Sequence, residues 1–344
     1  MGKNTKRALK AAMLIAMLAV LFFILRKIGF SSIYSNLLSA DKTYLLLSFL
    51  SALALFLAWN LKWKKLVDEV KPVKFWKLLP VLMAGSFVNT TTPGARVGGE
   101  PVRAYYLSKE HKIGKSRFFA TTVVDKVSNS IVFAALSAAS ILFVVLFVKI
   151  DTSIKIILET VLAVMFLAVA AGILLRRRIK FKRKYIKKSL EGIYYFFLFN
   201  ALRKKFNTYK KFEEYIIKKA NSIINTTKKI LKKTKLLKNS ILLALTMWGF
   251  NYLGTFFLFK AFGYNANFLA VAIVVTLSIL IGSIFALPGG IGLIETLMIS
   301  LYLAFGINSS VAATVAVIDR FIFYFYSLFA GGICFAYLSI KHKR

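Results

Sequence analysis

The sequence predicts an all-α integral membrane protein made of two inverted-topology repeats, each with the order helix, helix, re-entrant hairpin, helix. Of the 344 residues, 58% are hydrophobic, and the mean hydropathy is +0.68, which is above the range of ordinary soluble domains. The apolar residues form long runs, and the basic residues lie between these runs. A broken apolar stretch carrying the same motif occurs once in each half of the chain.

Six apolar runs are long enough to cross about 30 Å of hydrocarbon as single helices. They occupy residues 8–25, 43–61, 118–148, 154–175, 240–259 and 310–338. The first run has the basic start of a signal peptide but no small-residue cleavage site, so we expect it to be a retained span. Two further stretches, residues 78–107 and 268–305, are interrupted at residues 89–100 and 287–292.

Lysine and arginine placement sets the threading, because short cytoplasmic loops carry the positive excess. The basic segments are residues 3–10, 62–77, 109–117, 176–238 and 341–344. The charge-poor connections expected outside are residues 28–43, 149–153, 260–267 and 306–310. The basic segments and the charge-poor connections all fall on the expected side when both termini are cytoplasmic. The first broken stretch then enters from the cytoplasm and returns to it, and the second enters from outside and returns there. The repeats then cover residues 1–150 and 151–344.

The second repeat contains a basic insertion, residues 176–239. Aromatic residues are interleaved with its lysines and arginines, which is typical of amphipathic helices that lie in the membrane interface. We expect it to face the cytoplasm, where each base near an anionic leaflet contributes about 1 kcal/mol. Two roles stay open for this insertion. It either gathers anionic lipids at a cytoplasmic entrance or only anchors the protein at the cytoplasmic face.

The motif shared by the two broken stretches is Pro-Gly, a glutamate seven positions after the proline, and an Asp-base dipeptide farther on in a long apolar run. Its residues are Pro93, Gly94, Glu100, Asp125 and Lys126 in the first copy and Pro288, Gly289, Glu295, Asp319 and Arg320 in the second. Helices broken at corresponding places in two halves of a membrane protein point to a transport site. Their non-helical backbone must face protein or a water-filled cavity. The alternative is that each Pro-Gly pair is an ordinary helix kink and that the match between the two motifs is a coincidence.

The first break is dense in hydroxyls, glycines and charge, which indicates a lined site. Half-helices predicted over residues 100–107 and 291–304 both begin at membrane depth, and helix N-termini favour anions. We therefore expect the breaks to bind the phosphate of a lipid. The candidate binding residues are Asn89, Arg96, Gly98, Gly99, Arg103, Gly289 and Gly290.

Glu295 has apolar neighbours on both sides, and a charge at mid-helix costs about 3 kcal/mol or more. Capping a helix start contributes only about 0.3–1 kcal/mol, so we expect Glu295 to be paired or protonated. We assign coupling or ion-pair roles to six acids and bases. They are Glu100, Asp125, Lys126, Glu295, Asp319 and Arg320. For the two Asp-base dipeptides, ion pairs that lock the repeats together and contacts with substrate both stay open.

Other function classes find little support in the composition. The formal net charge is +36, but the bases lie between apolar spans, so we expect no nucleic-acid binding. One cysteine, Cys334, and two histidines, His111 and His342, provide neither a disulfide framework nor a metal site. No phosphate-loop motif for a nucleotide is present. We expect no cofactor and no metal, and the sequence leaves the oligomeric state open.

These motifs resemble the flippase-like membrane family that includes the transmembrane region of lysylphosphatidylglycerol synthases, the multiple peptide resistance factor, and many stand-alone members. The resemblance covers nearly the whole chain. It rests on Asn89, Pro93, Gly94, Gly98, Gly99, Glu100, Arg103 and Asp125, and on the run Leu-Pro-Gly-Gly-Ile-Gly at residues 287–292 with Glu295, Asp319 and Arg320. The resemblance implies that Arg96, Glu100, Arg103, Glu295 and Arg320 line a cavity.

In the two-part relatives, a soluble domain aminoacylates phosphatidylglycerol, and the membrane part is held to move the lipid between leaflets. This sequence has no such domain and no visible catalytic constellation, so the resemblance implies lipid translocation and no enzyme activity. We expect a multi-pass protein of the cytoplasmic membrane that translocates a lipid with an anionic headgroup. A gradient-driven transporter of a small anionic solute is the alternative, and an intramembrane lipid-modifying enzyme is less favoured.

Overall fold

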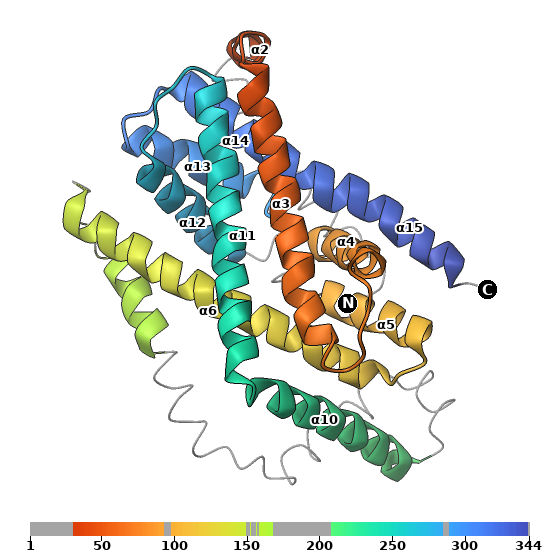
Figure 1. Ribbon diagram of the computed structural model, residues 1–344. Helices are drawn as coiled ribbons and strands as arrows, with labels where there is room; N and C mark the ends of the chain where they lie inside the picture. Colours follow the sequence, from red (N-terminus) through yellow and green to blue (C-terminus); the bar gives the residue numbers. More distant parts are fainter. Residues whose placement is uncertain are drawn as a thin grey trace. The chain divides into compact units, whose positions relative to one another are not determined.

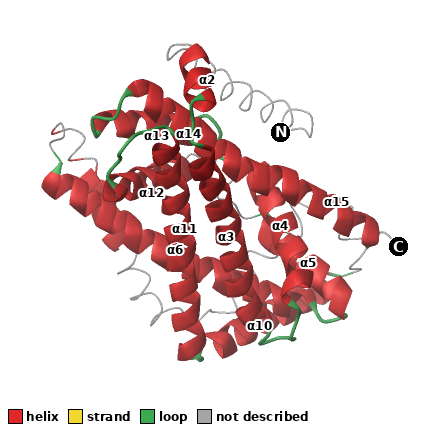
Figure 2. Cartoon of the chain, turned by 45° about the horizontal axis from the view of Figure 1, so that its top comes forward, coloured by secondary structure: helices red, strands yellow, loops and turns green. Residues whose placement is uncertain are grey.

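The computed structural model describes residues 30–92, 98–148, 152, 156, 158–167, 208–284 and 289–342. This part of the chain contains helices and loops and no strand (Figure 2), as the sequence predicts. Its helices are α2 (Phe30–Leu38), α3 (Lys42–Val67), α4 (Phe75–Thr91), α5 (Gly99–His111), α6 (Lys115–Phe147), α10 (Tyr209–Leu231), α11 (Thr234–Ala261), α12 (Phe268–Ile284), α13 (Leu293–Ala304), α14 (Ser309–Tyr324), the π-helix η1 (Phe325–Ala330) and α15 (Gly331–Lys341).

Four of the described helices are long and apolar enough to cross a membrane. They are α3, α6, α11 and the continuous helix Ser309–Lys341 formed by α14, η1 and α15. They confirm the spans predicted at 43–61, 118–148, 240–259 and 310–338. The predicted span at 8–25 lies outside the described residues. Of the span at 154–175, residues 158–167 are described and form an apolar helix.

By packing, the chain divides into two compact units, Met1–Ser140 with Ile230–Arg344, and Ile141–Lys229. The first unit contains both broken segments and all the charged clusters described below. Since the division reflects packing and not internal repetition, the repeat boundary expected at residue 150 stays a prediction.

Helix α3 is longer than its predicted span. It continues to Val67, and the amide of Asp68 closes its last turn by donating to the carbonyl of Lys64. Lys62 therefore lies inside the helix and is fully buried, so the prediction that a basic loop begins at residue 62 was wrong. The reason is that polar contacts in the protein interior, and not the apolar run alone, support this end of α3.

Helices α3 and α11 run antiparallel, side by side (Figure 1). At one end the amide of Asp41, just before α3, donates to the carbonyl of Ala261, the last residue of α11, at 2.8 Å. Farther along, Gly254 lies against Ser48 and Ser51, where an added Cβ would be 3.5 Å from the Ser51 Cβ. Small residues at such a contact let two membrane helices approach closely.

Both apolar segments predicted to be broken are broken. The first comprises α4, which ends at Thr91, and α5, which begins at Gly99. The second comprises α12 and α13, and α13 begins two residues later than predicted because Gly289, Gly290 and Gly292 all have positive φ angles. Helix α5 continues past its predicted end to His111, and Lys112 then ends it in the left-handed conformation.

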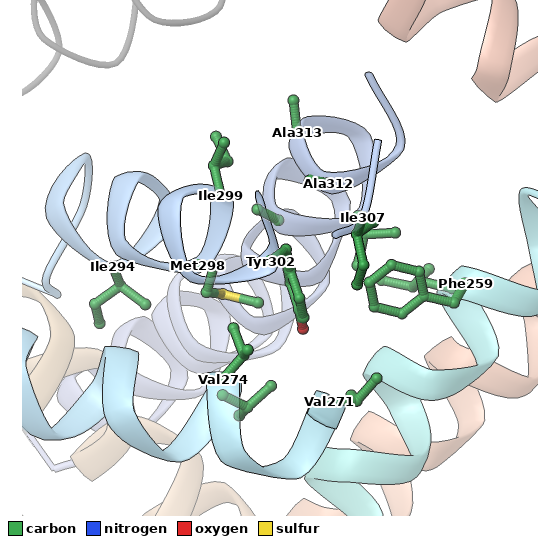
Figure 3. Packing of buried hydrophobic residues seen from close by; sticks show 14 of the residues in the cluster. Phe259, Val271, Val274, Ile294, Met298, Ile299, Tyr302, Ile307, Ala312 and Ala313 are labelled. Carbon is green, nitrogen blue, oxygen red and sulfur yellow. The ribbon is translucent and has the colours of Figure 1, made fainter. Parts of the chain in front are cut away.

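The second broken segment packs around a buried apolar cluster shared with α11 and α14. Figure 3 shows side chains from these four helices meeting there, with Met298 and Tyr302 of α13 between Val274 of α12 and Ala312 of α14. Gly282 and Gly290 allow this packing, since an added Cβ would come within 2.7 Å and 2.5 Å, respectively, of Ile294 side-chain atoms. The start of α13 is therefore fixed by close contact with α12.

The last span joins the two broken segments. Its α15 part packs on α4, where a Cβ at Gly331 would lie 2.7 Å from the carbonyl oxygen of Met83, and Tyr106 of α5 shares a 2.8 Å hydrogen bond with Ser339. Its α14 part packs on α13 through the cluster of Figure 3. The turn of π-helix between them, η1, is an irregularity that often marks functional sites.

The basic insertion predicted at 176–239 is described from residue 208 onward. Helix α10 exposes lysines such as Lys211, Lys218 and Lys228, together with the apolar side chains of Tyr215 and Ile224. This is the composition expected of an interfacial helix. Residues 176–207 lie outside the described part, and the location of the insertion in the cytoplasmic interface stays a prediction.

Candidate functional site

Asp125 is the centre of a buried ion cluster made by α3, α5 and α6. Its Oδ2 atom accepts hydrogen bonds from Nη1 and Nη2 of Arg103, both at 3.0 Å, and from Nε1 of Trp59 at 3.0 Å. Nζ of Lys62 lies 3.1 Å from Oδ1 and donates to the backbone carbonyl of Asp125 at 3.1 Å. The three charged side chains are at most 3% exposed.

Two tryptophans complete this arrangement, which we call the Asp125 cluster (Asp125, Arg103, Lys62, Trp59 and Trp63). The guanidinium carbon of Arg103 lies 4.5 Å from the ring centroid of Trp63 and 5.5 Å from that of Trp59. Such cation–π contacts contribute up to about 2 kcal/mol when desolvated. The guanidinium is thus held by a carboxylate at its edge and by aromatic rings at its face.

The sequence predictions did not include Lys62, Trp59 or Trp63. Their spacing of three and four positions places them on one face of α3, and this was the signal in the sequence that could have found them. It was hidden because Lys62 also opens a run of bases that resembles a cytoplasmic loop.

The dipeptide Asp125-Lys126 does not pair with itself, because consecutive side chains on a helix point in different directions. Lys126 instead forms a 3.3 Å ion pair with Glu100 at the start of α5. Glu100 is 8% exposed and Lys126 is 36% exposed. Lys126 therefore connects the buried cluster with a more accessible surface.

Asn89 and Gly99, predicted to bind substrate, hold the first broken segment together. The Oδ1 atom of Asn89 accepts from the amide of Gly99 at 2.6 Å, so this first amide of α5 is already occupied. A Cβ at Gly99 would lie 2.1 Å from the carbonyl oxygen of Gly85. Gly98 is the residue before the helix. Pro93, Gly94 and Arg96 lie outside the described residues.

Glu295 caps the start of α13. Its Oε2 atom accepts from the amide of Gly292 at 2.7 Å, and the hydroxyl of Tyr324 lies 3.3 Å from its Oε1 and 3.4 Å from the carbonyl oxygen of Gly289. The carboxylate is 2% exposed. The capping role considered from the sequence is therefore present, with Tyr324 as a further contact. Pro288 lies outside the described residues.

Asp319 and Arg320, unlike the first dipeptide, do pair with each other. Nε and Nη2 of Arg320 donate to Oδ2 of Asp319 at 2.9 Å and 2.6 Å. The hydroxyl of Thr255 on α11 donates to Oδ1 at 2.6 Å. We call Asp319, Arg320 and Thr255 the Asp319 cluster. It is less than 10% exposed, so α14 and α11 are joined by a buried charged contact.

The two clusters have equivalent positions in the chain. Asp125 is contacted by Lys62, 63 residues earlier on α3, and Asp319 by Thr255, 64 residues earlier on α11. Each aspartate therefore lies on a spanning helix and receives a hydrogen bond from the spanning helix that precedes the broken segment. The correspondence extends the repeated motif from the sequence to the side-chain contacts.

The two breaks adjoin. An added Cβ at Gly289 would lie 3.2 Å from Cγ2 and 3.4 Å from the carbonyl oxygen of Thr90, which places the turn before α13 beside the last turn of α4. Gly290 is the next residue of that turn and contacts Ile294. Within the described residues, no group of three or more His, Cys, Asp or Glu side chains could hold a metal ion.

Comparison with known proteins places the chain in a family. The family described as the lysylphosphatidylglycerol synthase TM region matches residues 9–331, nearly the whole chain. The chain belongs to this family. The match confirms the resemblance seen in the sequence, and it includes both broken segments and both clusters.

The similar curated proteins are archaeal, and each is described as a membrane protein. A UPF0104 membrane protein of Pyrococcus horikoshii is 27% identical over 315 residues, 90% of each chain. One of Methanothermobacter thermautotrophicus is 30% identical over 300 residues, 86% of this chain and 85% of its own. One of Methanocaldococcus jannaschii is 28% identical over 325 residues, 93% of this chain and 91% of its own. Together with the four spans, these similarities establish an integral membrane protein of this family.

Proposed function

We propose that this protein translocates a lipid with an anionic headgroup, such as a phospholipid or a polyprenyl-phosphate carrier, across the cytoplasmic membrane. The observation that carries the proposal is the burial of charged groups within apolar spans beside two adjoining helix breaks. Charged side chains inside membrane spans are rare and mark substrate or ion pathways. Family membership supports the same function, because the membrane region of lysylphosphatidylglycerol synthases is associated with lipid.

The proposed architecture is a pair of inverted repeats whose broken segments are re-entrant hairpins. Two observations support it: α3 and α11 are antiparallel, and Asp125 and Asp319 have partners at nearly equal offsets, 63 and 64 residues earlier. In inverted repeats, corresponding helices run in opposite directions and the substrate binds between the repeats. Both termini are then cytoplasmic, as the basic segments predict.

The proposed path uses the charged groups in complementary roles. Arg96 and Arg103, with the backbone of the two breaks, attract the phosphate. Glu100 pairs with Lys126 at 3.3 Å, and Glu295 is buried at the start of α13. These carboxylates balance the bases when no headgroup is bound, or carry a proton as the site alternates between the two sides.

We propose transport without chemical change of the lipid. An intramembrane enzyme needs a nucleophile with a base or a metal site, and the chain has only two histidines and one cysteine. A transporter of a small anionic solute is the alternative. A lipid path must open sideways to the bilayer between helices, whereas a solute path must open to water at each face.

The test is transbilayer movement of fluorescent lipids in vesicles that contain the purified protein. We expect wild type to move anionic lipid faster than zwitterionic lipid, and Glu295→Gln and Arg103→Ala to lose this movement. Glu214→Gln on α10 changes an exposed glutamate in the same way and serves as the matched control. Equal rates in wild type, Glu295→Gln and Arg103→Ala would refute the proposal. Transport of a soluble anion with no lipid movement would favour the alternative.

A further inference from the structure

The Asp125 cluster has more positive charge than its own carboxylate can balance. Lys62 and Arg103 share Asp125, and the three side chains are 0%, 1% and 3% exposed. The adjacent pair of Glu100 and Lys126 is neutral by itself. The cluster therefore has a net formal charge of +1 in a buried setting, where an unpaired charge is strongly unfavourable.

The same cluster contains a buried hydrogen-bond donor without an acceptor. Nε of Arg103 is buried and has no acceptor among the described residues. A lysine ammonium has three N–H groups, and Nζ of Lys62 contacts two oxygens, Oδ1 and the backbone carbonyl oxygen of Asp125. Two acceptors, Oδ1 of Asp125 and Oε2 of Glu100, also have no hydrogen bond. Each carboxylate nevertheless has an ion-pair partner, Lys62 at 3.1 Å and Lys126 at 3.3 Å. The net positive charge and the unpaired Nε of Arg103 together favour the binding of one further anionic oxygen group beside these two bases.

The corresponding place in the second half of the chain has the opposite balance. There, Thr255 occupies the position of Lys62, Arg320 pairs with Asp319, and the buried carboxylate of Glu295 caps α13. Arg320 and Asp319 balance each other, and Glu295 adds one negative formal charge. An excess of cations is therefore specific to the Asp125 cluster, although the two halves share their motif.

We propose that Lys62 and Arg103 form a binding site for one singly charged oxyanion, the phosphodiester of a lipid headgroup. The proposal rests on the proposed function and specifies its substrate. Asp125 balances one of the two bases, so a monoanion makes the site neutral. A dianionic phosphomonoester would give the site a net negative charge. Trp63 covers the face of the guanidinium, which leaves its Nε edge for the ligand. Lys126, 36% exposed, provides the first contact for an approaching headgroup.

Burial sets a condition on binding. Because Lys62, Arg103 and Asp125 are at most 3% exposed, the anion enters only when the contacts between Arg103 and Asp125 loosen. Competition between Asp125 and the phosphodiester for Arg103 then makes binding reversible, as translocation requires. A site that held the headgroup without such competition would bind it and not release it.

The experiment measures lipid binding and lipid movement in the same full-length variants. Binding of phosphatidylglycerol, phosphatidic acid and phosphatidylcholine is measured by native mass spectrometry of the protein in detergent, and movement is measured in vesicles of the same lipids. Lys62→Met removes the excess charge, Lys62→Arg keeps it, and Lys65→Met is the matched control on the same helix. Lys62→Gln replaces Lys62→Met if the latter does not fold.

We expect wild type to prefer phosphatidylglycerol to the other two lipids. Lys62→Met should weaken phosphatidylglycerol binding about tenfold or more, the effect of losing one charge-assisted hydrogen bond. Lys62→Arg and Lys65→Met should retain the preference. Unchanged phosphatidylglycerol preference in Lys62→Met and Lys62→Gln would overturn the proposal, as would a preference of wild type for phosphatidic acid.

Two further outcomes separate the possible sources of the anion and the two proposals. In the first, inorganic phosphate or dimethyl phosphate displaces phosphatidylglycerol from wild type but not from Lys62→Met. That result would support an anion site at Lys62 and identify a free anion, and not a lipid headgroup, as its ligand. Lys62-dependent phosphatidylglycerol binding with no lipid movement in any variant would support the binding site and refute translocation. Lipid movement that is independent of Lys62 would overturn the binding site alone.

Discussion

At the scale of the residue, Asp125 is the counter-charge on which two buried bases depend. Replacing Asp125 with Asn leaves Lys62 and Arg103 without a carboxylate, and removing one partner of a buried ion pair costs about 3–5 kcal/mol. Lys62→Met should cost less, because Arg103 and Asp125 remain a neutral pair with their 3.0 Å contacts. We expect the thermal unfolding temperature in detergent to fall most in Asp125→Asn, less in Lys62→Met, and not in Glu214→Gln.

The fluorescence of Trp59 and Trp63, which belong to the cluster, follows this unfolding. An Asp125→Asn protein that unfolds at the wild-type temperature would show that the two bases do not depend on Asp125. The sequence predicted a coupling or ion-pair role for Asp125 and phosphate binding for Arg103, but it did not predict that they contact each other. Partner choice depends on the direction of each side chain in the folded bundle, and Lys126, next to Asp125, points to Glu100 instead.

At the scale of the element, the first broken segment depends on the contact between Gly85 of α4 and Gly99 of α5. A Cβ at Gly99 would lie 2.1 Å from the Gly85 carbonyl oxygen, so Gly99→Ala must separate the two helices or disrupt the hydrogen bond that the Gly99 amide donates to Asn89. Overpacking of this kind costs about 1–3 kcal/mol or more. We expect a lower unfolding temperature for Gly99→Ala and slower lipid movement, because Arg103 is on the displaced helix.

Gly249→Ala is the matched control, because a Cβ there has no atom within 4 Å and alanine favours a helix over glycine by about 1 kcal/mol. Equal stability of the two alanine variants would contradict the close contact. The sequence located both breaks from Pro-Gly and from glutamate, since these residues interrupt an apolar helix. It placed the start of α13 two residues early, because Gly289, Gly290 and Gly292 adopt positive φ angles before the helix, and Gly290 packs closely against Ile294.

At the scale of the whole molecule, the Asp125 cluster and the Asp319 cluster occupy corresponding places in the chain and differ in net formal charge. The antiparallel pair of α3 and α11 and the adjoining breaks at Thr90 and Gly289 are the features that an inverted repeat requires. Charge placement predicts an inverted repeat, because positive loops stay in the cytoplasm, and the repeat stays a prediction. The orientation of the two broken segments depends on the same rule, and labelling of accessible positions tests it directly.

The prediction is that both ends of a broken segment lie on the same side of the membrane. In a Cys334→Ala background, Lys74→Cys and Lys115→Cys flank α4 and α5, while Asn265→Cys and Ser309→Cys flank α12 and α13; all four positions are exposed. A membrane-impermeant thiol reagent should label the first two only from the cytoplasmic face and the last two only from outside, because only then are the segments re-entrant and opposite in orientation. If the two ends of either segment were labelled from opposite faces, that segment would span the membrane and the repeats would not be inverted. Labelling of both segments from one common face would exclude opposite entry, and with it the alternating path that the proposed translocation uses.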